Sequence, residues 1–208
     1  MTRTMPVYVV DDDANMRHAL RRSITAAGFE AHLYAGGRDF LGGWDGRPGC
    51  LVLDLSMPDM HGMELLHTVD RRGLDLVVLV ITGYGTVEAA IRAMHGGALD
   101  FLEKPVDNIL LLEKIEAAVV TGQQRFARRA LARDYRQRLA ALTTREGEVL
   151  ELLVLGMTSP EIGRELAISR KTVDIHRSRI MQKLDAASVT DLVRDWYSLG
   201  AGALHARS

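Results

Sequence analysis

Three short strand-like segments, each followed at once by charged residues, constrain the fold of this 208-residue chain most. Such segments are typical of buried strands in a parallel sheet, and the carboxyl ends of those strands line the binding crevice of an open α/β fold. We therefore expect three carboxylates and one ammonium to meet at one edge of a sheet. The segments and their charges are Val7–Val10 with Asp11 and Asp12, Leu51–Leu53 with Asp54, and Asp100–Glu103 with Lys104.

Strand and helix patterns alternate over the first 119 residues. This alternation predicts a doubly wound sheet with right-handed crossovers, and we expect the flavodoxin-like strand order 2-1-3-4-5. At the helix ends we expect N-caps at Asp13 and Asn108, and C-terminal glycines at Gly28 and Gly73. Strands are expected near 7–11, 30–35, 50–55, 75–82 and 99–103, with helices near 15–27, 37–43, 61–72 and 86–95 and from about 109.

The composition is that of a folded protein long enough for two domains. Hydrophobic residues make up 47% of the chain and charged residues 25%, ordinary values that argue against disorder. No apolar stretch approaches the ~18 residues of a membrane span, and the first residues lack a signal-peptide pattern. The single Cys50 cannot support a disulfide framework or a cysteine-rich zinc site. We therefore expect a cytoplasmic protein with no membrane partner.

Charge is distributed unevenly behind the net value of −1. It amounts to −6 over residues 1–119, +5 over 120–140 and 0 over 141–208. The basic stretch predicts an arginine-rich helix, which is either an exposed linker with solvated charges or a helix that pairs with a partner chain or lies near phosphates. An acidic front half followed by a basic segment indicates two separate functions.

Beyond Leu142 the pattern is helical without strands. Two short helices joined by a tight turn, the second of them basic, are typical of a helix-turn-helix. The second of these helices is expected at 170–183 and carries a charge of +4. Helix starts are expected at Thr143 or Thr144 with Glu146, at Ser159 as an N-cap ahead of Pro160, and at Ser169 as an N-cap. A fourth helix is expected from roughly Ser188 to Leu199.

The residues at the strand ends have the composition of a phosphoryl-transfer site. Three like charges at one place repel each other unless a cation lies among them, and Mg²⁺ takes carboxylate, carbonyl and water oxygens as ligands. Thr82 adds a hydroxyl at the end of the fourth strand, and Lys104 adds a point charge for an anionic oxygen. A carboxylate nucleophile, a metal, a hydroxyl and an ammonium are together what phosphoryl transfer to an aspartate requires.

Four motifs occur in order along this part of the chain: Val9–Asp12, Leu53–Gly62, Ile81–Gly85 and Gly97–Pro105. Over residues 5–120 the chain closely resembles the receiver domains of two-component response regulators. The resemblance implies that Asp54 is the phosphoacceptor and that Lys104 contacts the phosphoryl group. It further implies that Asp12 binds Mg²⁺ directly, Asp11 through water, and the Ser56 backbone carbonyl as the remaining protein ligand.

The same resemblance implies a conformational switch. The Thr82 hydroxyl would move towards the phosphoryl group while the Phe101 ring turns inward, and Tyr84 is expected to influence access to the site. Phosphorylation adds negative charge and three acceptor oxygens at the site. In the family, the resulting conformational change extends over the fourth helix, fifth strand and fifth helix, which then act as a dimerisation face. The corresponding segment here is about 86–119.

Residues 142–199 resemble the LuxR-type helix-turn-helix of FixJ/NarL regulators. The matching segments are Leu142–Glu146, Glu161–Ile162, Leu166–Ser169, Thr172–His176 and Lys183–Leu184. In the expected recognition helix, Val173, Ile180 and Leu184 fit the core face. Candidates for phosphate or guanine contacts are Lys171, Arg177, Arg179 and Lys183, and the positions matching the family's base readers are Asp174, Ile175 and Ser178.

Asp174 departs from the lysine often found at its position. An acid in the major groove can accept a hydrogen bond from cytosine N4 but opposes nearby phosphates. It therefore bears on which sequence is bound rather than on whether DNA is bound. His176 is expected to pack between helices or face a phosphate rather than to contact a base.

These observations predict a DNA-binding response regulator that is not an enzyme. We expect a receiver domain at 1–120, a helical linker at 121–140 and the helix-turn-helix domain at 141–208. A sensor histidine kinase would phosphorylate Asp54, with Mg²⁺ as cofactor. The phosphorylated protein would then form a homodimer on double-stranded promoter DNA and recruit RNA polymerase.

Two other hypotheses remain open at this point. An aspartate-nucleophile phosphatase of the haloacid dehalogenase type has the two-residue spacing of Asp11 and Asp13, but it requires Thr or Val where Asn15 stands. It also requires a cap insertion and a later acidic pair, and neither is found in the sequence. The second alternative is a receiver that binds DNA without regard to phosphorylation.

Overall fold

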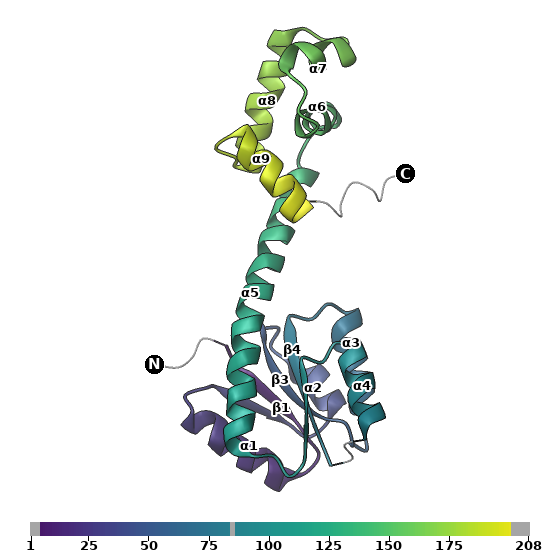
Figure 1. The fold of residues 1–208 in the computed structure, drawn as a ribbon, viewed down its shortest axis with the longest axis vertical. Helices are drawn as coiled ribbons and strands as arrows, with labels where there is room; N and C mark the ends of the chain where they lie inside the picture. The colour runs from purple at the N-terminus through teal and green to yellow at the C-terminus, as the bar shows by residue number, and fades with distance from the viewer. Residues whose placement is uncertain (1–4, 84–85, 201–208) are drawn as a thin grey trace. The chain divides into compact units, whose positions relative to one another are not determined.

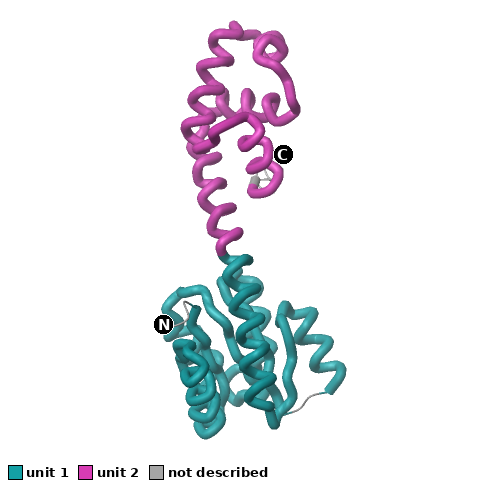
Figure 2. The backbone as a smooth tube through the Cα atoms, turned by 60° about the vertical axis from the view of Figure 1, so that its left-hand side comes forward, with its two compact units in different colours: residues 1–126 teal, residues 127–208 magenta. Residues whose placement is uncertain are grey.

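The computed structural model describes residues 5–83 and 86–200, which form two compact units. The first unit spans residues 1–126 and the second 127–208 (Figure 2). One helix, α5 (Asn108–Ala140), begins in the first unit and ends in the second, and it includes the segment expected as a linker. Tyr84, which was expected to influence access to the site, lies outside the described residues.

Five parallel strands form the sheet of the first unit, in the predicted order β2-β1-β3-β4-β5. Figure 1 labels β1, β3 and β4, which are the central strands of this order. The strands are β1 (Val7–Val10), β2 (Ala31–Tyr34), β3 (Gly49–Asp54), β4 (Leu76–Thr82) and β5 (Asp100–Glu103). Val10 lies beside Leu53 in the sheet, and Asp54 lies beside Ile81. Because neighbouring strands end at nearly the same level, the polar residues at their carboxyl ends are brought to one edge.

Helices cover both faces of this sheet and enclose two hydrophobic cores. They are α1 (Ala14–Ala26), α2 (Gly37–Gly43), α3 (Gly62–Arg71), α4 (Val87–His95) and the first part of α5. Side chains alternate along β1, since Val7 and Val9 enter the core with α1 and α5, while Tyr8 and Val10 enter the core with α2, α3 and α4. All of β1, β3 and β4 is buried, which explains their continuous apolar runs.

The helix ends of this unit confirm three of the four caps expected from the sequence. Asp13 caps α1 and accepts the backbone N–H of the second helical residue at 2.8 Å. Gly28 and Gly73 adopt left-handed backbone conformations, with φ of 86° and 60°. The prediction of Asn108 as an N-cap is wrong. Asp107 caps α5 instead, because its carboxylate accepts the backbone N–H groups of the second and third helical residues at 2.7 and 3.2 Å.

The second unit is built from helices around one core. After α5 come α6 (Thr144–Val154), α7 (Ser159–Glu165), α8 (Arg170–Leu184), α9 (Val189–Asp195) and a π-helical segment (Trp196–Gly200). Val173, Ile180 and Leu184 of α8 are buried in this core, as predicted. Tyr135 and Leu139 pack into the same core, so the last turns of α5 are part of the unit. No helix in the described parts of the chain is long and apolar enough to cross a membrane.

The first two helices after α5 begin at threonine N-caps. At α6, Thr143 and Glu146 form a capping box, which agrees with one of the two predicted starts. At α7 the prediction of Ser159 as N-cap is wrong, because Thr158 occupies that position. The backbone N–H and hydroxyl of Thr158 donate to Glu161 at 2.7 and 2.6 Å. Ser159 is the first helical residue, and its hydroxyl is therefore available to other partners.

Candidate functional site

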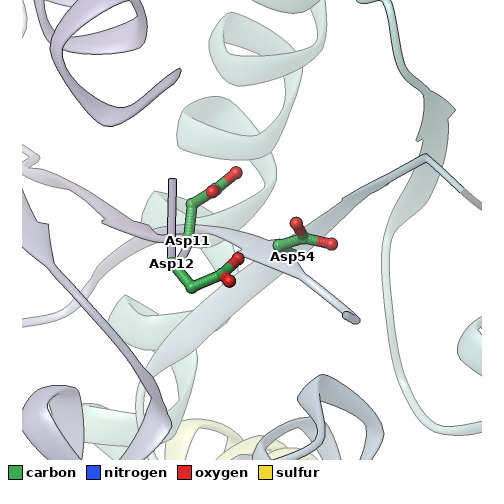
Figure 3. A group of neighbouring side chains, drawn as sticks. All are labelled: Asp11, Asp12 and Asp54. Atoms are coloured by element: carbon green, nitrogen blue, oxygen red, sulfur yellow. The ribbon is translucent and has the colours of Figure 1, made fainter. Parts of the chain in front are cut away.

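Three aspartates from neighbouring strands meet at the carboxyl edge of the sheet. Asp11 and Asp12 follow β1, and Asp54 ends β3. One ligand oxygen from each lies within 4.8 Å of the other two, and Figure 3 shows the side chains grouped at the strand ends. Asp11 and Asp54 are buried, whereas Asp12 is exposed. Among the described residues, no other three acidic, histidine or cysteine side chains come together in this way.

Lys104, which follows β5, joins two of these carboxylates. Its ammonium donates to Asp11 Oδ2 at 2.7 Å and to Asp54 Oδ2 at 2.6 Å. The remaining oxygens accept backbone N–H groups, with Asp13 donating to Asp11 at 2.8 Å and Ser56 donating to Asp54 at 3.0 Å. Burial lowers the pKa of Lys104, but the two carboxylates raise it by more, so the ammonium stays charged. Both buried carboxylates are thus held in a fixed orientation.

The donor set of this cluster suits a hard divalent cation. All its donors are carboxylate oxygens, which Mg²⁺ prefers over nitrogen and sulfur. The three carboxylates carry a charge of −3 and Lys104 supplies only +1, so the cluster keeps an excess of negative charge. A divalent cation would balance that excess. The residues present therefore fit the magnesium site expected from the sequence.

Thr82 and Phe101 lie on adjacent strands next to the cluster. Thr82 ends β4 and is 1% exposed, while Phe101 on β5 is half-buried and packs against the core that includes α3 and α4. Thr82 lines a cavity of about 230 Å³ together with Ser56 and residues of α3 and α4. The structure thus places the expected switch hydroxyl beside open space at the phosphoacceptor edge.

Gly62 brings the start of α3 against the end of β3. A Cβ at this position would lie 2.2 Å from the Asp54 carbonyl oxygen and 2.6 Å from the Leu55 Cα, closer than any side chain can approach. The Gly62 backbone N–H donates to the Leu55 carbonyl at 3.0 Å. The sequence contained this glycine in a receiver-like motif, but only the packing shows that it supports Asp54.

The exposed face of α8 carries most of the residues predicted to contact DNA. Ile175 on this helix is 45% exposed. His176 is half-buried, and its Nδ1 has no hydrogen-bond partner among the described residues. The exposed candidates are Lys171, Asp174, Ile175, Ser178, Arg179 and Lys183, and Arg177 is half-buried.

Lys183 also makes bonds inside the second unit. Its ammonium donates to Glu146 Oε2 at 2.7 Å and to the Ala141 carbonyl at 3.0 Å. The Glu146 side chain is only 3% exposed, and Lys183 together with the Thr143 N–H lowers its pKa to about 2. Lys183 therefore ties α8 to α6 and to the end of α5. The sequence showed the capping box of Glu146 but not its second partner.

Asp174 and Arg177 both make contacts inside the second unit. Asp174 Oδ1 accepts the Ser159 hydroxyl at 2.8 Å, and Arg170 Nε lies 3.7 Å from the other oxygen. Arg177 Nη1 donates to the same Ser159 hydroxyl at 2.8 Å. The resemblance to the LuxR-type helix-turn-helix put Asp174 at a base-reading position and gave no sign of its link to α7.

Comparison with known proteins agrees with both halves of this description. Residues 7–116 match the response regulator receiver domain, and residues 140–195 match the LuxR family of bacterial regulatory proteins. The transcriptional regulatory protein FixJ of Bradyrhizobium diazoefficiens is 37% identical over 206 residues, which is 99% of this chain and 100% of that protein. FixJ of Rhizobium meliloti is 39% identical over 189 residues, covering 90% of this chain and 93% of that protein.

Solved structures show the same similarity. The response regulator StyR matches with a TM-score of 0.81 and 36% identity, over 92% of this chain and 98% of StyR. Full-length FixJ from B. japonicum matches with a TM-score of 0.58 and 37% identity, over 96% of this chain and 99% of FixJ. The fold and the site define a receiver domain joined to a DNA-binding helix-turn-helix.

The chain belongs to the FixJ-like response regulators, which are phosphorylation-dependent regulators of transcription. Members of this family pair with sensor kinases and bind DNA. The family expected from the sequence is thus confirmed.

Proposed function

We propose that Asp54 of this chain accepts a phosphoryl group from a cognate sensor histidine kinase. The observation that carries the proposal is the buried Asp54 carboxylate, held between the Ser56 N–H and the Lys104 ammonium within a group of three acids. An Asp54 oxygen bonds to phosphorus as the bond to the kinase histidine nitrogen breaks, and the electron pair stays on that nitrogen. Lys104 then holds a phosphoryl oxygen. The chain promotes only this transfer and the later hydrolysis, in which a water oxygen bonds to phosphorus as the bond to the Asp54 oxygen breaks and inorganic phosphate leaves. It acts on no other substrate.

Mg²⁺ is the cofactor of this proposal. Asp11, Asp12 and Asp54, with the backbone carbonyl of Ser56, would hold the ion. When bound, it supplies neutralising charge for the phosphoryl oxygens. The protein's own contribution is to hold the buried carboxylates in place through backbone N–H groups and Lys104.

The proposed output is a homodimer formed through the face of about 86–119. Thr82 and Phe101 are the switch residues, because they lie on adjacent strands that connect the acceptor site to this face. Along α4, Val87, Ile91 and Met94 are 71%, 51% and 46% exposed, at a spacing that puts them on one side of the helix. An exposed apolar stripe of this kind fits a protein interface better than solvent.

The second unit is proposed to bind promoter DNA through α8 and to recruit RNA polymerase in the cytoplasm. Lys171, Arg177 and Arg179 would contact phosphates or guanines, and Ile175 and Ser178 would face base edges. We assign Lys183 to holding α8 in place instead, since its ammonium is already bound to Glu146. A dimer holds its two copies of α8 at a fixed separation, so it would bind paired DNA half-sites with the matching spacing.

The test is to locate the phosphoryl group and to follow its effect. The full chain is incubated with acetyl phosphate and Mg²⁺, and the modified residue is mapped by mass spectrometry after borohydride trapping. We expect modification at Asp54, none in Asp54→Asn, and dimerisation and tighter DNA binding only for the wild type. Modification at Asp11 would instead support the phosphatase hypothesis. Equal DNA affinity of wild type and Asp54→Asn would support a receiver that does not respond to phosphorylation.

A further inference from the structure

Ser159 links the two helices of the helix-turn-helix through a pair of hydrogen bonds. It is the first residue of α7 and is 5% exposed, although its side chain is polar. Its Oγ lies 2.8 Å from Asp174 Oδ1 and 2.8 Å from Arg177 Nη1, both on α8. A guanidinium can only donate, so the Ser159 oxygen accepts from Arg177 and its single proton goes to Asp174.

This arrangement is not needed to start α7. Thr158 is the N-cap, and its backbone N–H and hydroxyl donate to the Glu161 carboxylate. The Ser159 hydroxyl is therefore not needed to cap the helix. The buried Ser159 hydroxyl forms its hydrogen bonds to side chains of α8, so it can fix the orientation of those side chains. The link therefore acts on the two α8 side chains that it contacts.

The link has opposite consequences for these two side chains. The Asp174 carboxylate has one oxygen on Ser159 and the other 3.7 Å from Arg170, so it is engaged within the protein. The Arg177 guanidinium is half-buried and keeps four of its five N–H groups beyond the bond to Ser159. An arginine that is already oriented loses less rotamer freedom when it binds an anion.

We propose that Ser159 is a positioning residue for DNA binding, which orients Arg177 towards a DNA phosphate and keeps Asp174 away from the bases. The inference rests on the proposed DNA-binding function. It assigns Asp174 an intramolecular role in place of base recognition. It assigns Arg177 a contact that contributes affinity without sequence preference.

A double-mutant cycle in the full chain tests the link between Ser159 and Arg177. The probes are a duplex selected from random sequence by the acetyl-phosphate-treated wild type and a scrambled duplex of equal length. Arg177→Ala is expected to weaken binding to both duplexes and to reduce the slope of log affinity against log salt by about one. Ser159→Ala is expected to weaken both about threefold to tenfold, the range for losing the pre-ordering of one long side chain.

The decisive measurement is Ser159→Ala in the Arg177→Ala background. For the scrambled duplex we expect no further loss of affinity there, because Ser159 affects sequence-independent binding through Arg177, whereas its bond to Asp174 concerns base recognition. Full additivity of the two losses would overturn the inference. Thr190→Ala, which removes an exposed hydroxyl on α9, is the matched control and is expected to bind like the wild type.

Asp174→Asn tests the second half of the inference, that Asp174 does not contact the bases. This test does not depend on Ser159→Ala being able to fold. The amide oxygen still accepts from Ser159, so both duplexes are expected to change affinity by the same factor. An altered base preference in a repeated selection would show that Asp174 contacts a base and would overturn the inference. Wild type that binds neither duplex would refute the proposed function itself, which is a distinct outcome.

Discussion

Each unit of this protein contains a buried carboxylate paired with a lysine, yet the two pairs differ in their charge balance. Asp54 and Lys104 are 2.6 Å apart in the first unit, and Glu146 and Lys183 are 2.7 Å apart in the second. The two carboxylate side chains are 5% and 3% exposed. The distance within each pair and the burial of its carboxylate therefore do not distinguish the two pairs, although Lys104 is 18% exposed and Lys183 36%.

The surroundings of the two pairs do distinguish them. Lys104 is shared between Asp54 and Asp11, with Asp12 beside them, so negative charge is in excess. Glu146 is the one carboxylate that Lys183 contacts among the described residues, and it also accepts the backbone N–H of Thr143, the N-cap of α6. An acidic cluster with excess negative charge attracts a cation, whereas a balanced pair holds helices together.

The largest expected effect comes from removing the balanced carboxylate. Glu146→Ala leaves the Lys183 ammonium without its buried partner and breaks the capping box of α6. We expect the second unit to lose about 2–3 kcal/mol of stability, from a lost helix cap and a lost hydrogen bond between charged groups, because Lys183 itself stays partly exposed to water. Urea unfolding can be followed by Trp196 fluorescence in a Trp44→Phe background, and the matched control is Glu148→Ala on the same helix. A loss below about 1 kcal/mol would show that the pair is not structural.

Acid should produce part of the same loss. The folded-state pKa of Glu146 is about 2, lowered by Lys183 and by the Thr143 N–H, against about 4.3 for an unfolded chain. Because the folded pKa is depressed, this stabilisation is complete above about pH 4.3 and is lost as the pH falls towards 2. Glu146→Gln is expected to flatten the pH dependence of the Trp196 unfolding midpoint in this range. An unchanged pH profile in Glu146→Gln would assign the acid sensitivity to other groups.

Binding of Mg²⁺ is expected to stabilise only the unit with excess negative charge. At a concentration ten times its Kd, a ligand that binds only the folded state adds about 1.4 kcal/mol. The unfolding midpoint reported by Trp44 in a Trp196→Phe background should rise with Mg²⁺, while that reported by Trp196 should not. Asp12→Asn should abolish the rise, and NaCl at matched ionic strength controls for screening. A rise that persists in Asp12→Asn would place the ion elsewhere.

The smallest expected effect is that of neutralising the phosphoacceptor on stability. Asp54→Asn removes one of three converging negative charges while Lys104 keeps its bond to Asp11. We expect the first unit to stay within about 1 kcal/mol of the wild type, in contrast to Glu146→Ala. Thermal unfolding without Mg²⁺ gives the comparison. A loss of stability as large as that caused by Glu146→Ala would mean that Asp54 stabilises the folded first unit in addition to forming the phosphoacceptor site.

Local patterns were sufficient for the architecture of the first unit. Its strands, their order and the meeting of Asp11, Asp12 and Asp54 at one edge follow from buried runs, helix periodicity and the rules of parallel sheets. Cap assignments were less secure where two polar residues adjoin. Asp107 replaced Asn108 and Thr158 replaced Ser159, because either neighbour can cap and the backbone path decides which one reaches the free N–H groups.

The sequence by itself therefore determined which elements form, how the strands are ordered and which charged residues reach the carboxyl edge. Only the tertiary structure decided which charges are left unbalanced. Only the structure showed that Lys183 donates to Glu146, 37 residues away, and that Ser159 donates to Asp174. The physical reason is that side-chain pairing depends on distance in space. Periodicity and caps report only the neighbours along the chain.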